Sequence, residues 1–336
     1  MKIIALYGVL QDRLNLNFLK ISIKSLYNSV DEIIVLFDTP NDQKKIKKEL
    51  FLKKKKISIY YSKRKLKKTN SPVTELLKIG RNHKGSHFIF LDADEALTYK
   101  LSKNIKSFLK KMKKGEKLFF HWMSMWKHHQ YFRIDKKSLW SNLYKDFVYC
   151  DNLKDTFTEY YHDYGRTPGE NTENRIIKIS SDQGAIMHFQ YVNWINYQYK
   201  QAWNMCHTLT LKKNMISTNF SQSANKINRM YYYTYFENFP KVKKISILEL
   251  RHIPKKYFKN INFDNSKFWK KKFNFFFEKN NIENFEELNI WHIPFLQNIF
   301  LRRTNRLPKK KLENKLIFFL FIILEIIRNL IRIFKK

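Results

Sequence analysis

The sequence predicts an α/β protein with a Rossmann-like, mostly parallel sheet that helices cover on both faces, followed by a helical C-terminal extension. Segments that are apolar throughout, such as 2–9 (KIIALYGV) and 87–91 (HFIFL), alternate with segments of helical periodicity. Strands with two apolar faces are typical of parallel sheets covered by helices. All seven glycines lie between Gly8 and Gly184. We therefore expect the turns of a sheet protein in the first half and helices in the second.

Each expected element has a signal of its own. Short apolar runs rich in β-branched residues indicate strands, and apolar residues that recur every three or four positions indicate helices. The expected strands are 2–9, 32–37, 57–61, 87–91, 117–125 and a short run within 184–194. The expected helices are 16–26, 43–55, 71–82, 191–213 and 227–236. The third of these helices begins with Ser71 as cap and Pro72 in the first turn.

The composition fits a large folded chain with a strong basic excess. The 336 residues are 43% hydrophobic, and 65 Lys and Arg against 29 Asp and Glu give a net charge of +36. Such an excess favours nucleic acid, anionic lipid or a phosphorylated substrate as partner. Two distant cysteines, Cys150 and Cys206, are not a disulfide framework and indicate a reducing compartment. The N-terminus is interpreted as a first strand, because Asp12 and Arg13 interrupt its apolar run and no cleavage pattern follows.

The C-terminal segment 311–336 differs from the rest of the chain. Its nine consecutive apolar residues, 316–324, are fewer than the roughly 20 that a membrane span needs. Charged and polar residues then follow at steps of three and four, opposite an Ile, Leu and Phe face. The pattern favours an amphipathic helix lying on an anionic membrane surface. A terminal helix docked on the protein's own core is the alternative.

Acidic side chains follow three of the expected strands. Asp12 comes shortly after the first, Asp38 directly after the second, and Asp92 and Asp94 after the fourth. The carboxyl ends of parallel strands meet at one edge of a sheet, where ligands bind. Carboxylate oxygens suit Mn²⁺ or Mg²⁺, and such an ion neutralises a diphosphate leaving group. The sequence therefore predicts a divalent cation here, with a simple surface turn after a buried strand as the alternative.

The stretches VDEIIV (30–35) and FLDADE (90–95), at this separation, resemble the family 2-type glycosyltransferases of the GT-A fold. The resemblance covers roughly residues 1–100, weakens to about 200 and is absent beyond. It implies transfer of a sugar from a nucleotide-sugar donor with the help of Mn²⁺ or Mg²⁺. The loop at 38–42 departs from the family's acidic, Ser-rich nucleotide loop, and Gln11-Asp12 stands where the family has Asn-Glu.

Carried over residue by residue, the resemblance implies roles for several side chains. Asp38 would contact the nucleotide base, Asp92 the ribose or a metal-bound water, and Asp94 the metal directly. His188, in a short apolar strand, would be a further metal ligand, although a histidine in an apolar run is also commonly a core residue. The expected cofactor-binding set is completed by Asp12 and by Arg81, one of the cationic side chains that would hold phosphates.

An inverting member of the family needs a general base near the acceptor hydroxyl. The segment 142–168 lies between the fifth strand and the His188 strand, where the acceptor loop is expected. Asp151 and Asp146 are the candidates, and Asp151 is preferred because Asn152 after it indicates a turn. Competing candidates for the base and for phosphate or acceptor contacts are Asp155, Glu159, Asp163, His162 and Arg166.

The sequence analysis thus predicts three regions. Residues 1–190 would form the nucleotide-sugar-binding and catalytic domain, 191–310 an acceptor-side helical extension, and 311–336 the membrane-associated helix. The expected activity is sugar transfer to a cell-surface glycan or lipid-linked acceptor, by a cytoplasmic protein peripheral on the inner face of the membrane. A nucleotidyltransferase of related fold and a non-catalytic nucleic-acid binder remain alternatives. No recognised binding motif favours nucleic acid as partner.

Overall fold

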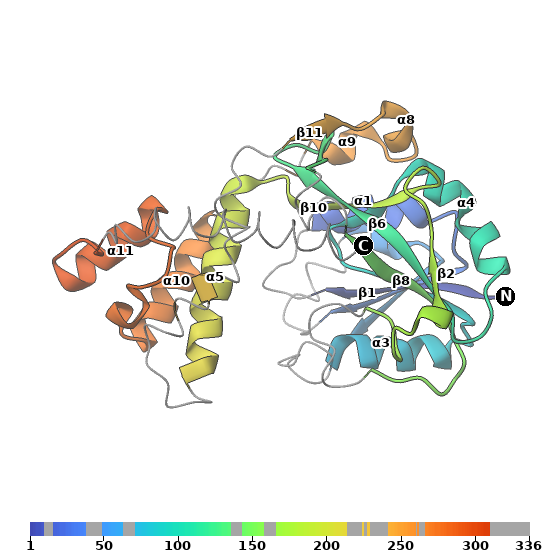
Figure 1. Ribbon diagram of the computed structural model, residues 1–336, viewed down its shortest axis with the longest axis horizontal. Helices are drawn as coiled ribbons and strands as arrows, with labels where there is room; N and C mark the ends of the chain where they lie inside the picture. Colours follow the sequence, from blue (N-terminus) through green and yellow to red (C-terminus); the bar gives the residue numbers. More distant parts are fainter. Residues whose placement is uncertain are drawn as a thin grey trace, which may run out of the picture. The chain divides into compact units, whose positions relative to one another are not determined.

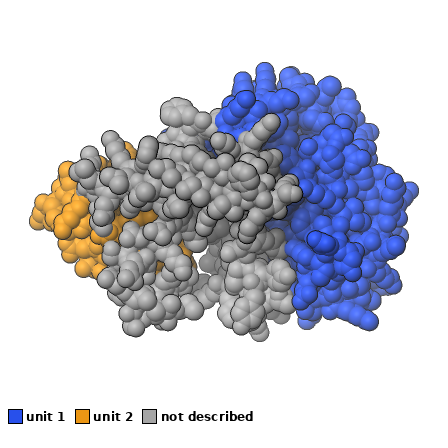
Figure 2. All heavy atoms as spheres, in the orientation of Figure 1, with its two compact units in different colours: residues 1–197, 238–264 blue, residues 198–237, 265–336 orange. Residues whose placement is uncertain are grey.

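The computed structural model describes residues 1–9, 16–37, 49–62, 71–135, 143–157, 166–213, 224, 227–228, 241–259, 261 and 266–309. The chain divides into two compact units, coloured separately in Figure 2. Unit 1 comprises residues 1–197 and 238–264, and unit 2 comprises residues 198–237 and 265–336. The functional division expected from the sequence stays a prediction.

Unit 1 is built on one mixed sheet, with strand order β11-β7-β6-β8-β4-β1-β2-β3 (Figure 1). Four neighbouring strands are parallel, namely β1 (Ile3–Val9), β2 (Glu32–Phe37), β3 (Ile57–Tyr61) and β4 (His87–Leu91). The strand β8 (Tyr144–Cys150) runs antiparallel between β4 and β6 (Lys117–Trp126). The strand β10 (Ala185–Tyr191) pairs parallel with β6 and antiparallel with β5 (Glu95–Leu97). The α/β sheet that the sequence predicts is confirmed, with parallel pairing from β4 through β1 and β2 to β3 and mixed pairing beyond β4.

The smaller strands extend β6. They are β9 (Ile176–Lys178), which pairs with β6 directly, and the antiparallel pair β7 (Tyr131–Arg133) and β11 (Val242–Lys244). Neither these strands nor β8 were expected from the sequence. The segment 142–168, expected to be an acceptor loop, therefore begins with a central strand of the sheet.

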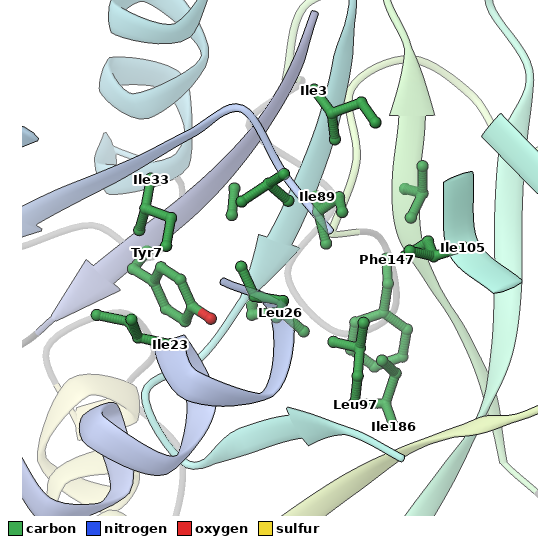
Figure 3. Packing of buried hydrophobic residues seen from close by; sticks show 14 of the residues in the cluster. Ile3, Tyr7, Ile23, Leu26, Ile33, Ile89, Leu97, Ile105, Phe147 and Ile186 are labelled. Carbon is green, nitrogen blue, oxygen red and sulfur yellow. The ribbon is translucent and has the colours of Figure 1, made fainter. Parts of the chain in front are cut away.

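Alternate residues of the strands fill two different cores, which is why the runs are apolar throughout. Ile3, Ala5 and Tyr7 of β1 face the core that includes helices α1 (Leu16–Leu26) and α4 (Tyr99–Lys110), shown in Figure 3. Ile4 and Leu6 face the other core, against helix α3 (Ser71–Asn82). Helices therefore cover both faces of the sheet, as predicted.

Most of the expected elements of unit 1 are confirmed. Helix α3 has the predicted bounds and contains Ser71 and Pro72 in its first turn. The basic helix expected at 43–55 is replaced, in its described part, by the single 3-10 turn Leu50–Lys53. The remaining helical pieces of unit 1 are the 3-10 turn Glu173–Arg175, α8 (Ile247–Leu250) and α9 (Lys255–Phe258). Cys150 and Cys206 are both free and buried.

Unit 2 is helical in its described part. It contains most of α5 (Trp194–Lys213), α10 (Ser266–Lys279), the 3-10 turn Ile282–Phe285 and α11 (Pro294–Thr304). Its core combines aliphatic side chains with several large aromatic ones, among them Trp269, Phe273, Phe277 and Phe300. The predicted 191–213 helix is confirmed, whereas the 227–236 helix and the segment 311–336 fall almost wholly or wholly outside the described residues. Within the described part of the chain, no helix is both long and apolar enough to span a bilayer.

Candidate functional site

The candidate site begins where β4 ends. All five residues of β4 are buried, and the chain then turns so that the Glu95 amide donates to the Asp92 carbonyl, with an N–O distance of 3.1 Å. The side chain of Glu95 closes the turn, since its Oε2 accepts from the Asp92 amide at 2.8 Å. Glu95 then starts β5 and pairs with His188 of β10. The acidic motif is therefore held between two strands of the sheet.

Asp94 and His188 lie together although 94 positions separate them in the chain. Their side-chain atoms Oδ2 and Nε2 are 3.6 Å apart. The Phe189 amide donates to the Asp94 carbonyl at 2.8 Å, which ties the motif to β10. The His188 side chain is 3% exposed and that of Asp94 is 23% exposed. A buried imidazole thus reaches a carboxylate that is partly open to solvent.

Trp122 of β6 packs against this pair. Its ring stacks on His188, with centroids 4.0 Å apart and an interplanar angle of 20°. Its indole Nε1 donates to Glu95 Oε1 at 2.7 Å. The Lys145 ammonium lies 3.6 Å from the centroid of the Trp122 ring. Burial first of all, then the charge of Arg166, lowers the pKa of Lys145 to about 8.

Glu95 is fully buried and lies at the centre of the site. Burial raises the pKa of its carboxyl group to about 7; the charge of Arg166 opposes this rise, and Asp92 and Asp94 add to it. Arg166 makes a close ion pair with Glu95 through Nη1, and its Nη2 lies 2.9 Å from Asp92 Oδ2. One guanidinium therefore bridges two carboxylates of the motif.

Asp146 fixes the backbone from which Arg166 extends. Its Oδ2 accepts from the amides of Arg166 and Thr167, both at 2.9 Å, and from the Thr167 hydroxyl at 2.6 Å. The residue lies within β8 and is fully buried. An acceptor hydroxyl has no access to such a side chain. This corrects the prediction that Asp146 is a general base: the structure makes it a positioning residue for Arg166.

Asp151 and Arg81 lie at the opposite edge of the sheet. Since β8 runs antiparallel to β4, its last residue, Cys150, pairs with His87, the first residue of β4. Asp92 follows the other end of β4, roughly 16 Å away at 3.3 Å per residue. The structure therefore does not bring Asp151 to the acid cluster, contrary to its predicted role as base. The prediction failed because β8 was taken for a loop.

Arg81 and Asp151 are paired with each other. Arg81 Nε and Nη2 donate to the two carboxylate oxygens of Asp151 at 3.0 and 2.8 Å, and Nη2 also donates to the Asp155 carbonyl at 2.8 Å. The Asp151 side chain is 2% exposed. The pair joins α3 to the end of β8. The predicted cofactor-binding role of Arg81 thus gives way to a structural ion pair.

Asp151→Asn is expected to destabilise the protein by about 2 kcal/mol, because it leaves the Arg81 guanidinium without its counter-charge. Urea unfolding of the variant and the wild type measures this difference. If the protein has the sugar-transfer activity that the sequence predicts, its turnover well below the unfolding transition is expected to stay within about twofold of wild type. A much larger loss of turnover at unchanged stability would restore Asp151 to the acceptor site.

Several expected site residues lie outside the described part of the chain, namely Asp12, Asp38, Glu159, His162 and Asp163. Conversely, Trp122 and Lys145 line the site without having been predicted. Trp122 was placed correctly in a strand, but its contact with His188 depends on the pairing of β10 with β6, which nothing local in the sequence signals.

Two of the described residues, Asp94 and His188, are candidate ligands for a divalent cation. No group of three or more His, Cys, Asp or Glu side chains is arranged to hold a metal in the described ranges. The Asp94 Oδ2 and His188 Nε2 separation of 3.6 Å is only slightly wider than the roughly 3.0–3.4 Å between two ligands bound at about 2.1 Å. A cation bound to phosphates commonly has only one or two protein carboxylates, with substrate oxygens and water completing its shell. The pair therefore fits such a cation.

The comparisons with known proteins identify no family. No family model matches the sequence, and no curated protein matches it. Solved structures with a similar arrangement include S. aureus TarS, at 14% identity and a TM-score of 0.37, covering 71% of this chain and 45% of that one.

Two further solved structures show the same range of likeness. Residues 1–349 of TarS in complex with UDP-GlcNAc match at 13% identity and a TM-score of 0.36, over 90% of this chain and 88% of that one. The 4-diphosphocytidyl-2C-methyl-D-erythritol synthase of Anaerococcus prevotii DSM 20548 matches at 16% identity and a TM-score of 0.31, over 45% of this chain and 71% of that one. At these scores the likenesses carry no argument about function, which is inferred from this chain's own residues.

Proposed function

We propose that this protein is a glycosyltransferase that moves a sugar from a nucleotide-sugar donor with the help of Mn²⁺ or Mg²⁺. The observation that carries the proposal is the pairing of Asp94 with His188 at the carboxyl end of β4, beside the guanidinium of Arg166. Ligands of α/β sheets bind at this edge. In this proposal the site combines a carboxylate oxygen and an imidazole nitrogen as ligands for a cation with positively charged side chains that bind phosphate.

Each side chain has a definite task in this proposal. A cation held by Asp94 and His188 would supply the Lewis acidity that stabilises a departing nucleoside diphosphate. Arg166 and Lys145 add positive charge at the same place, and Asp146 and Glu95 hold Arg166 in position. Asp92, whose side chain is 58% exposed, remains accessible to the ribose or to a metal-bound water. Asp38 belongs to the proposed donor site as the contact for the base.

The acceptor we propose is a cell-surface glycan or a lipid-linked precursor. The support is the net charge of +36 and the amphipathic pattern of 311–336, which suit an anionic membrane surface. The protein would then act from the cytoplasmic side as a peripheral membrane protein. The acceptor would meet the catalytic unit at that surface.

A donor screen tests the proposed activity. The purified protein is incubated with Mn²⁺ and a panel of nucleotide sugars, and release of nucleoside diphosphate is measured with and without EDTA. We expect turnover of at least one donor, lost on chelation and restored by added Mn²⁺. Nucleoside triphosphates with sugar phosphates are assayed in parallel. Pyrophosphate release from these, with no turnover of any nucleotide sugar, would instead indicate a nucleotidyltransferase.

A further inference from the structure

The segment 241–259 of unit 1 combines exposed aliphatic side chains with dense positive charge. It contains β11, α8 and α9, which Figure 1 shows along one border of unit 1. Ile247 and Leu248 are each 59% exposed, and Val242 is 40% exposed. Seven Lys and Arg residues of the segment are all exposed, namely Lys241, Lys243, Lys244, Arg251, Lys255, Lys256 and Lys259.

The segment has one acid, and that acid already has a partner. Glu249 Oε2 accepts from the Lys100 amide at the start of α4, with an N–O distance of 3.0 Å. Within the segment the seven cations are accompanied by this single carboxylate, and one further acid, Asp135, lies at its start, where it accepts from the Lys241 amide. A solvated loop explains exposed lysines, and lysines on an edge strand such as β11 hinder unwanted strand pairing. Neither explanation covers two adjacent aliphatic side chains exposed on the turn of α8.

These side chains are presented from a fixed base. Ile245, Leu250, Ile253 and Phe258 of the same segment are buried in a core shared with α1, β6 and β10. His252 Nε2 lies 3.0 Å from the Leu97 carbonyl, two residues after Glu95. Buried and exposed apolar residues thus alternate around α8. The exposed set belongs to a stable surface of the unit that carries the candidate site.

We propose that this surface, centred on Ile247 and Leu248, docks on an anionic lipid bilayer independently of the C-terminal segment. Aliphatic side chains at the tip enter the headgroup region, and the surrounding cations pair with lipid phosphates. Nucleic acid fits less well, because single strands are held by exposed aromatic rings between cations. The exposed large apolar residues within 241–259 are aliphatic, and one exposed ring, that of Tyr131 on β7, lies opposite Lys244.

The test places a reporter on the surface itself, in the full chain. Ile247→Cys is labelled with the environment-sensitive fluorophore NBD; the native Cys150 and Cys206 are buried, and labelling of the wild type checks that they do not react. The matched control is Leu153→Cys, at a position that is 72% exposed, outside the segment 241–259 and two residues after Asp151. Each protein is mixed with phosphatidylcholine vesicles with and without phosphatidylglycerol.

With the anionic vesicles only, the fluorescence of the label at 247 is expected to become brighter and to shift to shorter wavelength. The fluorescence of the label at 153 is expected to remain unchanged. Adding Lys243→Glu and Lys244→Glu is expected to weaken vesicle affinity at least about tenfold. The same change to Glu at Lys110 and Lys111, which are exposed at the far end of α4, is expected to alter the vesicle affinity less than about threefold.

Three outcomes would overturn the proposal. The first is a label at 247 whose fluorescence does not change when vesicles are added, whether or not the protein sediments with them. The second is an equal response at 153, which would indicate non-specific adsorption. The third is a single-stranded oligonucleotide that alters the 247 label as the vesicles are expected to, which would assign the surface to nucleic acid. None of these outcomes depends on sugar transfer, so the proposed function is tested separately.

Discussion

Asp94→Ala is expected to lower turnover of the nucleotide-sugar donor by about a thousandfold. In the proposed site the residue is a direct ligand of the cation, and loss of several kcal/mol of charge stabilisation in the transition state corresponds to a factor of this size. The side chain is 23% exposed, so little packing is lost when it is removed. The measurement is kcat/KM for nucleoside diphosphate release at saturating Mn²⁺.

The matched control is Asp182→Ala, which removes an exposed turn carboxylate from the same unit. It is expected to leave kcat/KM within about twofold of wild type. Binding of the nucleoside diphosphate, measured by titration calorimetry, separates the two roles of the site. Asp94→Ala is expected to abolish the dependence of this binding on Mn²⁺. If the Asp94→Ala variant has wild-type turnover and wild-type Mn²⁺ dependence, the proposal of a cation site at the end of β4 is wrong.

Arg166→Met is expected to destabilise the protein by about 3 kcal/mol at pH 8, and by much less at pH 5. The substitution leaves the fully buried Glu95 without its ion-pair partner, which is among the costliest changes in a protein interior. Burial already raises the pKa of Glu95 to about 7. Loss of the guanidinium raises it further, so at pH 5 the carboxyl is protonated and the penalty is small. Urea unfolding at the two pH values measures the difference.

The sign of this pH dependence follows from proton binding. The folded protein binds the Glu95 proton more tightly than the unfolded chain does, so the stability that this group contributes falls as the pH rises from about 4.5 toward 7. The fall is expected to be steeper and to extend to higher pH in Arg166→Met. The double variant Arg166→Met with Glu95→Gln tests the cause. It is expected to recover most of the loss at pH 8, and an unrecovered loss would assign the effect to packing alone.

The sequence predicted the parallel half of the sheet and the position of the acid motif, because both depend on local patterns. Fully buried strands such as β4 have continuous apolar runs, and Asp92 and Asp94 follow directly in the chain. His188 was predicted from a family resemblance, and the structure places it beside Asp94. These predictions needed no knowledge of which strands pair across long separations.

The choice of Asp146 and Asp151 as bases failed because strand direction is not a local property, whereas the candidates Glu159, His162 and Asp163 lie outside the described residues and stay predictions. The polar residues Lys145 and Asp146 interrupt the apolar pattern of β8, so the sequence resembles a loop. In the structure both are part of a central strand whose polar side chains serve the site. Asp146 accepts three hydrogen bonds around Arg166, and Lys145 lies over Trp122. Charged residues within a strand that is otherwise apolar commonly mark a functional site, and this signal in β8 was missed in the sequence.

The two aspartates of β8 have a consequence for how the sheet assembles. Asp146 is tied to the backbone at Arg166 and Thr167, and Asp151 just past the strand is tied to Arg81. A slip of β8 by one residue would turn Asp146 to the opposite face and break both attachments at once. The alignment of β8 with β4 is therefore locked at its two ends by charge as well as by hydrophobic pattern. A mispaired sheet would be penalised during folding before any substrate is present.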